Sequence, residues 1–251
     1  MRRRLAAGNW KMNGGLASLG EIDALAAAHP APRSEVVICP PATLLAPALE
    51  RTRGTPLRLG GQDCHAEPAG AHTGDISAAM LKEAGAAYVI LGHSERRGDH
   101  GETGELVRAK ATAAQAEGLT AIVCVGEQLS EREAANTLDI IGGQMSASIP
   151  DGSTGHNLVV AYEPVWAIGM GRTPTPDQIG EVHDFMRARL ERRFGAGVGR
   201  SVRLLYGGSV RAGNAETIFA VSNVDGALVG GASLTAAEFA PIVSALEAAA
   251  G

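Results

Sequence analysis

The chain has 251 residues, of which 45% are hydrophobic and 20% charged, and its formal net charge is −5. This length suits one large domain, and the lack of a basic stripe argues against a nucleic-acid partner. No run of about 18 apolar residues occurs, so the sequence predicts a protein without a membrane span.

Short apolar runs alternate along the chain with longer segments whose apolar residues recur every three or four positions. The runs are aliphatic on both faces, as in strands that are buried on both sides of a parallel sheet. They predict strands at 4–7, 35–39, 57–61, 88–91, 120–125, 158–162, 203–206 and 226–229. The helical pattern covers 16–28, 43–53, 77–84, 102–117, 130–147, 176–194, 214–220 and 234–249.

Eight strand–helix units follow one another without a break in composition. This repetition predicts an α/β fold in which residues 1–251 form a single (β/α)8 barrel domain. A doubly wound open sheet is the alternative, but that fold has fewer strands and a G-x-G-x-x-G turn after the first one. Here the first strand runs into Asn9, Trp10 and Lys11.

The carboxyl ends of barrel strands carry the active site, and several of these ends are polar here. Asn9 and Lys11 follow the first strand, His93 and Glu95 follow the fourth, and Glu163 follows the sixth. A lysine, a histidine and a carboxylate at one mouth are typical of proton transfer on an anionic carbonyl compound.

Each of these residues taken alone also fits an ordinary structural role, and their convergence favours chemistry. The apolar neighbours of Glu163 are expected to raise the pKa of its carboxyl toward that of a useful base. His93 precedes a short helix whose amides favour the neutral imidazole. Lys11 would supply a fixed positive charge for an enediolate oxygen and for phosphate.

Two glycine turns follow the seventh and eighth strands, where barrels bind phosphate. Gly207, Gly208 and Ser209 form the first turn, and Gly230 and Gly231 form the second. Backbone N–H groups can approach an anion there without obstruction by a Cβ atom, and a short helix at 232–234 would point its dipole at the anion. Residues 164–173, rich in glycine and bounded by prolines, are expected to form a lid that keeps water from a reactive enediolate.

Over nearly its whole length the sequence resembles the triosephosphate isomerase family. Five ordered motifs carry the resemblance: GNWKMN at 8–13, GHSERR at 92–97, AYEPVWAIG at 161–169, YGGSV at 206–210 and LVGGA at 228–232. The resemblance implies isomerisation of dihydroxyacetone phosphate and D-glyceraldehyde 3-phosphate through an enediol(ate), in glycolysis and gluconeogenesis, without a metal or a cofactor.

The resemblance also implies a role for each matching residue. Glu163 would be the base, His93 the neutral electrophile and Lys11 the catalytic cation. The substrate would be bound by Asn9 and Lys11, with phosphate held by the amides of Gly169, Ser209, Gly230 and Gly231. Glu95 would support Lys11.

Family members are usually homodimers, in which the loop at 66–75, including Thr73, reaches into the partner subunit near Lys11. The sequence has three cysteines, and no two of them form a C-x-x-C motif. This pattern favours reduced thiols in a cytoplasmic protein.

The expected lid departs from the family pattern at its tip, where Met170 replaces a common threonine. This change keeps a second hypothesis open, in which the same chemistry acts on a phosphorylated tetrose of the erythrulose phosphate type. A third hypothesis, from another class, is a barrel that binds phosphorylated metabolites without catalysis. It predicts loss of the base or the electrophile, whereas Glu163 and His93 are both present.

Overall fold

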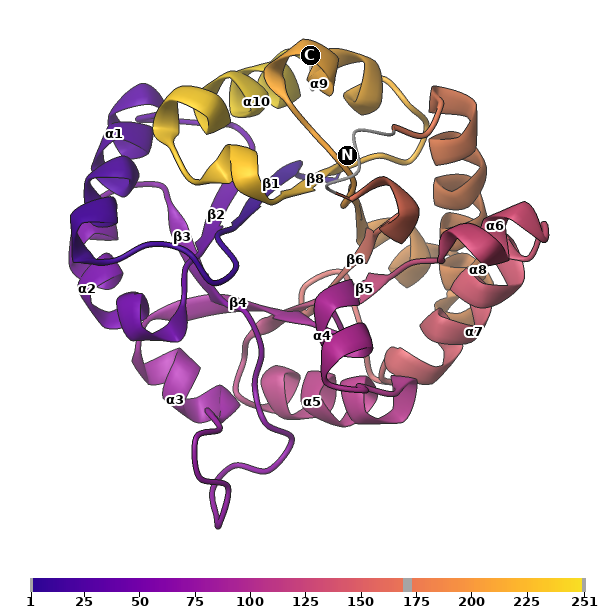
Figure 1. The fold of residues 1–251 in the computed structure, drawn as a ribbon, viewed down its shortest axis with the longest axis horizontal. Helices are drawn as coiled ribbons and strands as arrows, with labels where there is room; N and C mark the ends of the chain where they lie inside the picture. The colour runs from indigo at the N-terminus through magenta and orange to yellow at the C-terminus, as the bar shows by residue number, and fades with distance from the viewer. Residues whose placement is uncertain (1, 169–172, 250–251) are drawn as a thin grey trace.

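Eight parallel strands form a closed barrel surrounded by helices (Figure 1). The computed structural model describes residues 2–168 and 173–249. Each strand pairs with the next in sequence, and β8 pairs with β1 to close the ring. The predicted α/β class and the (β/α)8 barrel are thereby confirmed. The strands are β1 (Leu5–Asn9), β2 (Glu35–Cys39), β3 (Arg58–Gly61), β4 (Ala86–Leu91), β5 (Thr120–Val125), β6 (Leu158–Tyr162), β7 (Arg203–Tyr206) and β8 (Gly226–Val229).

The outer layer contains the helices that connect these strands. The α-helices are α1 (Gly20–Ala28), α2 (Ala42–Thr52), α3 (Ala78–Glu83), α4 (Ser94–Asp99), α5 (Gly104–Ala116), α6 (Leu129–Glu133), α7 (Thr137–Ser148), α8 (Pro176–Ser201), α9 (Ala212–Phe219) and α10 (Ala236–Ala248). Three short 3-10 turns complete the described part: η1 (Leu16–Leu19), η2 (Val165–Ala167) and η3 (Gly231–Ser233).

Alternation along each strand divides the core into two parts. On β1, Leu5 and Ala7 belong to the barrel interior, whereas Ala6 packs outward with the helices. The same period of two applies to β5, where Ile122 faces inward and Val123 faces outward. Because both faces of the sheet are covered, the strands are mainly apolar, as the sequence pattern predicted, and charged residues such as Glu35, Arg58 and Arg203 stand at their first positions.

Several predicted helix boundaries are wrong, and backbone geometry explains two of them. The helix expected at 130–147 is divided into α6 and α7, because Ala135 adopts φ 57, a left-handed conformation that an α-helix cannot contain. The helix expected at 176–194 continues to Ser201, where a second helical segment follows Gly195, whose φ is 79 and ψ is 157. None of the helices in the described ranges is long and apolar enough to cross a membrane.

Candidate active site

A cavity of about 280 Å³ opens at the carboxyl ends of the strands. It is lined by residues from the segments that follow β1, β4, β6, β7 and β8, as expected for a barrel of this kind. The lining includes these predicted site residues: Asn9, Lys11, His93, Glu163, Ser209, Gly230 and Gly231. Gly169 and Met170 lie outside the described residues.

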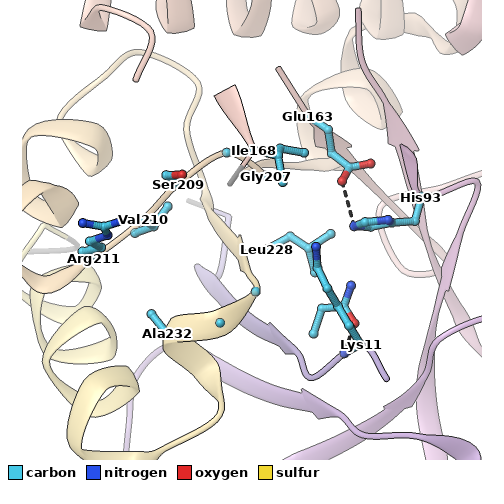
Figure 2. A pocket seen from close by; sticks show the side chains of 14 residues that line it. Lys11, His93, Glu163, Ile168, Gly207, Ser209, Val210, Arg211, Leu228 and Ala232 are labelled. Atoms are coloured by element: carbon cyan, nitrogen blue, oxygen red, sulfur yellow. Dashed lines mark hydrogen bonds and ion pairs between the residues drawn. The ribbon is translucent and has the colours of Figure 1, made fainter. Parts of the chain in front are cut away.

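The end of β1 holds Lys11 in an unusual backbone conformation. Its φ is 53, which is uncommon for a residue other than glycine. The Lys11 amide donates a hydrogen bond of 2.9 Å to the Oδ1 atom of buried Asn9. Asn9 thus supports the turn that directs the lysine side chain into the cavity (Figure 2).

Two further side chains fix Lys11 from behind. Its Nζ atom lies 2.6 Å from Oε1 of Glu95, so the contact predicted for Glu95 exists. The Gln62 side chain donates to the carbonyl oxygens of Lys11, at 2.8 Å, and Cys39, at 2.9 Å. Gln62 was not among the predicted site residues, although it directly follows β3 and its position at a strand end marks it as a candidate.

His93 and Glu163 are in direct contact across the mouth of the barrel (Figure 2). The Nε2 atom of His93 lies 2.9 Å from Oε1 of Glu163, and both side chains are largely buried. Ser94 donates two more hydrogen bonds to the same carboxylate, from its amide at 3.0 Å and from its hydroxyl at 3.2 Å. The Nδ1 atom of His93 accepts a hydrogen bond from the Glu95 amide at 3.2 Å, so the proton of the neutral ring belongs on Nε2.

This contact shifts both pKa values away from the sequence prediction. Burial alone would raise the pKa of Glu163, but His93 and the Ser94 donors outweigh burial and lower it. Burial alone would lower the pKa of His93, but the Glu163 carboxylate outweighs burial and raises it. The expected raised pKa of Glu163 is therefore wrong for this arrangement, because each partner stabilises the charged form of the other.

The two glycine turns form further parts of the cavity wall, and Gly207 in the first of them lies next to Glu163. Gly230 immediately precedes η3, and its carbonyl oxygen accepts a hydrogen bond of 2.7 Å from the Ser233 hydroxyl. The Trp10 indole donates to the Ser233 carbonyl oxygen at 2.9 Å, which ties η3 to the end of β1. The short helix predicted at 232–234 is present as this 3-10 turn, with Gly231 as its first residue. The arrangement leaves room for an anion beside the backbone of this turn.

Glu127 holds the start of the segment that is expected to form the lid. It is fully buried, and its Oε1 atom accepts hydrogen bonds from the Tyr162 hydroxyl at 3.0 Å and the Trp166 indole at 2.8 Å. Arg132 lies 3.1 Å from the same oxygen and supplies the compensating charge. Glu127 was not among the predicted site residues, although it follows β5 by two residues.

The loop at 66–75 projects from the barrel between β3 and α3 (Figure 1), with Thr73 exposed. At its base His65, His72 and Asp75 come close enough to share a metal ion. However, Nδ1 of His65 accepts a hydrogen bond of 3.0 Å from the Glu67 amide. This places the proton of the neutral ring on Nε2, the atom that faces Asp75, and disfavours a metal bond there.

Comparison with known proteins identifies the family. The family model described as triosephosphate isomerase matches residues 4–246. A triosephosphate isomerase from Dinoroseobacter shibae is 69% identical over 246 residues, covering 98% of this chain and 100% of the relative. One from Ruegeria pomeroyi is 63% identical over 251 residues, covering 100% of both chains.

A solved structure agrees with these sequences. The crystal structure of triosephosphate isomerase from Bartonella henselae superposes with a TM-score of 0.92 at 48% sequence identity. The match covers 97% of this chain and 98% of that one. The chain belongs to the triosephosphate isomerase family.

Proposed function

We propose that Glu163 carries the proton by which this chain, an aldose–ketose isomerase, interconverts dihydroxyacetone phosphate and D-glyceraldehyde 3-phosphate. The reaction is a step of glycolysis and gluconeogenesis. The observation that carries the proposal is the arrangement of Glu163, His93 and Lys11 around one cavity, with Nε2 of His93 only 2.9 Å from the carboxylate. The relatives support a triose phosphate substrate, and they lend no support to a tetrose or to a barrel without catalysis.

The phosphate group binds at the glycine turns. Amides of Ser209, Gly230 and Gly231 bound the cavity on that side, where an anion needs no close approach to a Cβ atom. Gly169, the fourth proposed donor, lies outside the described residues. Phosphate held there directs the carbonyl end of the substrate toward His93 and Lys11.

The carbonyl oxygen then takes over hydrogen bonds that the free site makes internally. The Nε2–H group of His93, which donates to Glu163 in this structure, turns to the substrate oxygen, and Lys11 supplies positive charge beside it. Loss of the His93 contact removes the main interaction that lowers the pKa of Glu163. Burial then raises that pKa, which makes the carboxylate a stronger base when substrate is bound.

Glu163 removes a proton from C1 of dihydroxyacetone phosphate and returns it to C2. The electron pair of the broken C–H bond forms the enediolate, whose negative charge is stabilised by His93 and Lys11. A hydroxyl proton moves between the two oxygens, so atoms and charge balance. The Glu95 carboxylate, 2.6 Å from Lys11, holds the lysine in place during these steps.

A coupled assay tests this proposal directly. Turnover is measured on triose phosphates and on a phosphorylated tetrose, with substrate added to the purified full chain. The proposal expects the triose phosphates to react with the higher kcat/KM. Triose turnover no better than background contradicts it, and a higher kcat/KM on the tetrose transfers the chemistry to the larger sugar.

We further propose a homodimer in which the loop at 66–75, with Thr73, contacts the partner subunit near Lys11. Exposed apolar side chains support this assembly. Met12 and Leu16 follow β1, as Lys11 does, and Met80 lies in α3, directly after the loop. A single monomeric species in sedimentation velocity would contradict it. We also propose that residues 1–251 are one domain of a cytoplasmic protein, where the buried free thiols of Cys39, Cys64 and Cys124 stay reduced.

A further inference from the structure

One charged residue lines the cavity without a role in the chemistry described above. Arg211 immediately precedes α9 and belongs to the lining of the active-site cavity. Figure 2 places its side chain beside Ser209 and Val210, across the cavity from the Glu163–His93 pair. Arg211 therefore lies on the side where the glycine turns receive phosphate.

The backbone at this position is firmly held, whereas the guanidinium group is free. The Arg211 amide donates a hydrogen bond of 2.8 Å to Oδ1 of Asn214, and Nδ2 of Asn214 donates to the Ser209 carbonyl oxygen at 3.1 Å. The same asparagine thus fixes Ser209 and Arg211 relative to each other. Within residues 2–168 and 173–249, no side chain forms an ion pair within 4.0 Å of the exposed Arg211 guanidinium.

The charges around the cavity show why this free cation matters. Among the described residues, Lys11 is the other cation in the lining, and its Nζ atom is already paired with Glu95 at 2.6 Å. Glu163 adds a negative charge at the reacting end. Without Arg211 these groups would present a net negative site to a doubly charged phosphate ester, in a chain whose formal net charge is −5. Arg211 restores neutrality at the phosphate end.

We propose that Arg211 is a binding residue for the phosphate dianion, which it attracts into the cavity and retains beside the Ser209 turn. It acts by charge, on the phosphate end of the substrate and not on the reacting carbons. Loss of the Arg211 charge should therefore raise KM and slow association of the substrate, with kcat little changed. Salt should screen the attraction between Arg211 and phosphate. The inference rests on the proposed function, because it assumes a phosphorylated substrate.

The test compares R211Q, R211K and R58Q with the unaltered chain. Arg58 is exposed and opens β3, at the other end of the barrel, so R58Q makes the same change in net charge far from the cavity. At low ionic strength we expect R211Q to raise KM for triose phosphate about three- to tenfold, with kcat within about twofold. R211K and R58Q should stay close to the unaltered chain, and added salt should reduce the R211Q difference.

Calorimetric titration with inorganic phosphate supplies a second readout that requires no turnover. Weaker phosphate binding by R211Q than by R58Q supports the proposal. Equal binding and equal KM in these two variants overturn it, as does a fall in kcat with KM unchanged. Equal impairment of R211K and R211Q also overturns it, because charge would then not be the cause. If the unaltered chain turns over no triose phosphate, the proposed function fails, while the phosphate titration still decides the role of Arg211.

Discussion

His183 makes the stability of this barrel dependent on pH between about 4 and 6.5. The residue lies in α8 with no exposed surface, and its Nδ1 atom is 3.0 Å from the Asn223 carbonyl oxygen. That acceptor requires a proton on Nδ1. The Nε2 atom is buried and has no hydrogen-bond partner in the described part of the chain. A second ring proton would therefore be buried without compensation, and burial lowers the pKa of His183 to about 4.

The sign of the effect follows from the two pKa values. The unfolded chain binds a proton at His183 near pH 6.5, whereas the folded chain binds one only near pH 4. Above this window both states are neutral there and the residue has no pH-dependent effect. Within it the unfolded state carries the extra proton, so the free energy of unfolding falls as the pH falls. Each pH unit is worth about 1.4 kcal/mol, which amounts to about 3 kcal/mol across the window.

The comparison is between the unaltered chain and H183N, whose amide nitrogen can replace Nδ1 as donor to Asn223 but cannot titrate. The free energy of unfolding is measured by urea denaturation from about pH 7 to about pH 4.5, at constant protein concentration. H183N is expected to be less stable near neutral pH because it leaves a cavity. Its disadvantage should shrink by about 2 to 3 kcal/mol at the acid end. Parallel pH profiles for the two proteins would show that protonation of His183 does not contribute to the pH dependence.

Two further substitutions probe the site and the barrel interior. In G207A the new Cβ atom would lie 2.9 Å from Cγ of Glu163 and displace the base, so we expect kcat in the coupled assay to fall by on the order of tenfold or more. G213A is the control, because its Cβ atom meets nothing within 4 Å. Equal kcat values for the two variants would show that the Gly207 contact does not position Glu163. E35Q removes the carboxylate that lies 2.7 Å from Nη1 of Arg203, and should lower the free energy of unfolding by about 3 kcal/mol at neutral pH. Because the pKa of Glu35 is lowered in the fold, the ionised carboxylate stabilises the fold above the ordinary glutamate pKa, and this stabilisation is lost as the pH falls through the lowered value. The difference in the free energy of unfolding between E35Q and the unaltered chain should therefore disappear in acid. A difference that persists in acid would exclude the ion pair as its cause.

The sequence was enough to predict the barrel and most of the site, because both depend on local patterns. Strand ends are marked by short apolar runs, and in a closed parallel barrel all the carboxyl ends meet at one mouth. Residues as distant in sequence as Asn9, His93 and Glu163 could therefore be assigned to one cavity from the sequence alone. Their chemical types then indicated proton transfer.

What the sequence could not predict depends on contacts between distant segments. The lowered pKa of Glu163 arises from donors on His93 and Ser94, some 69 residues away, whereas its sequence neighbours indicated only burial. Similarly, Glu127 acquires its role from partners on the segment after β6. The break at Ala135 was missed because no glycine or proline marks it, and alanine favours the helix there.

E163D tests whether Glu163 moves the proton. The shorter side chain withdraws the carboxylate while its charge remains, so phosphate binding should stay within about twofold of the unaltered chain. The displaced base should lower kcat on triose phosphate by on the order of 10²-fold or more. E83D makes the same chemical change on the exposed end of α3 and should leave kcat intact. If E163D turns over triose phosphate as fast as E83D does, Glu163 is not the base.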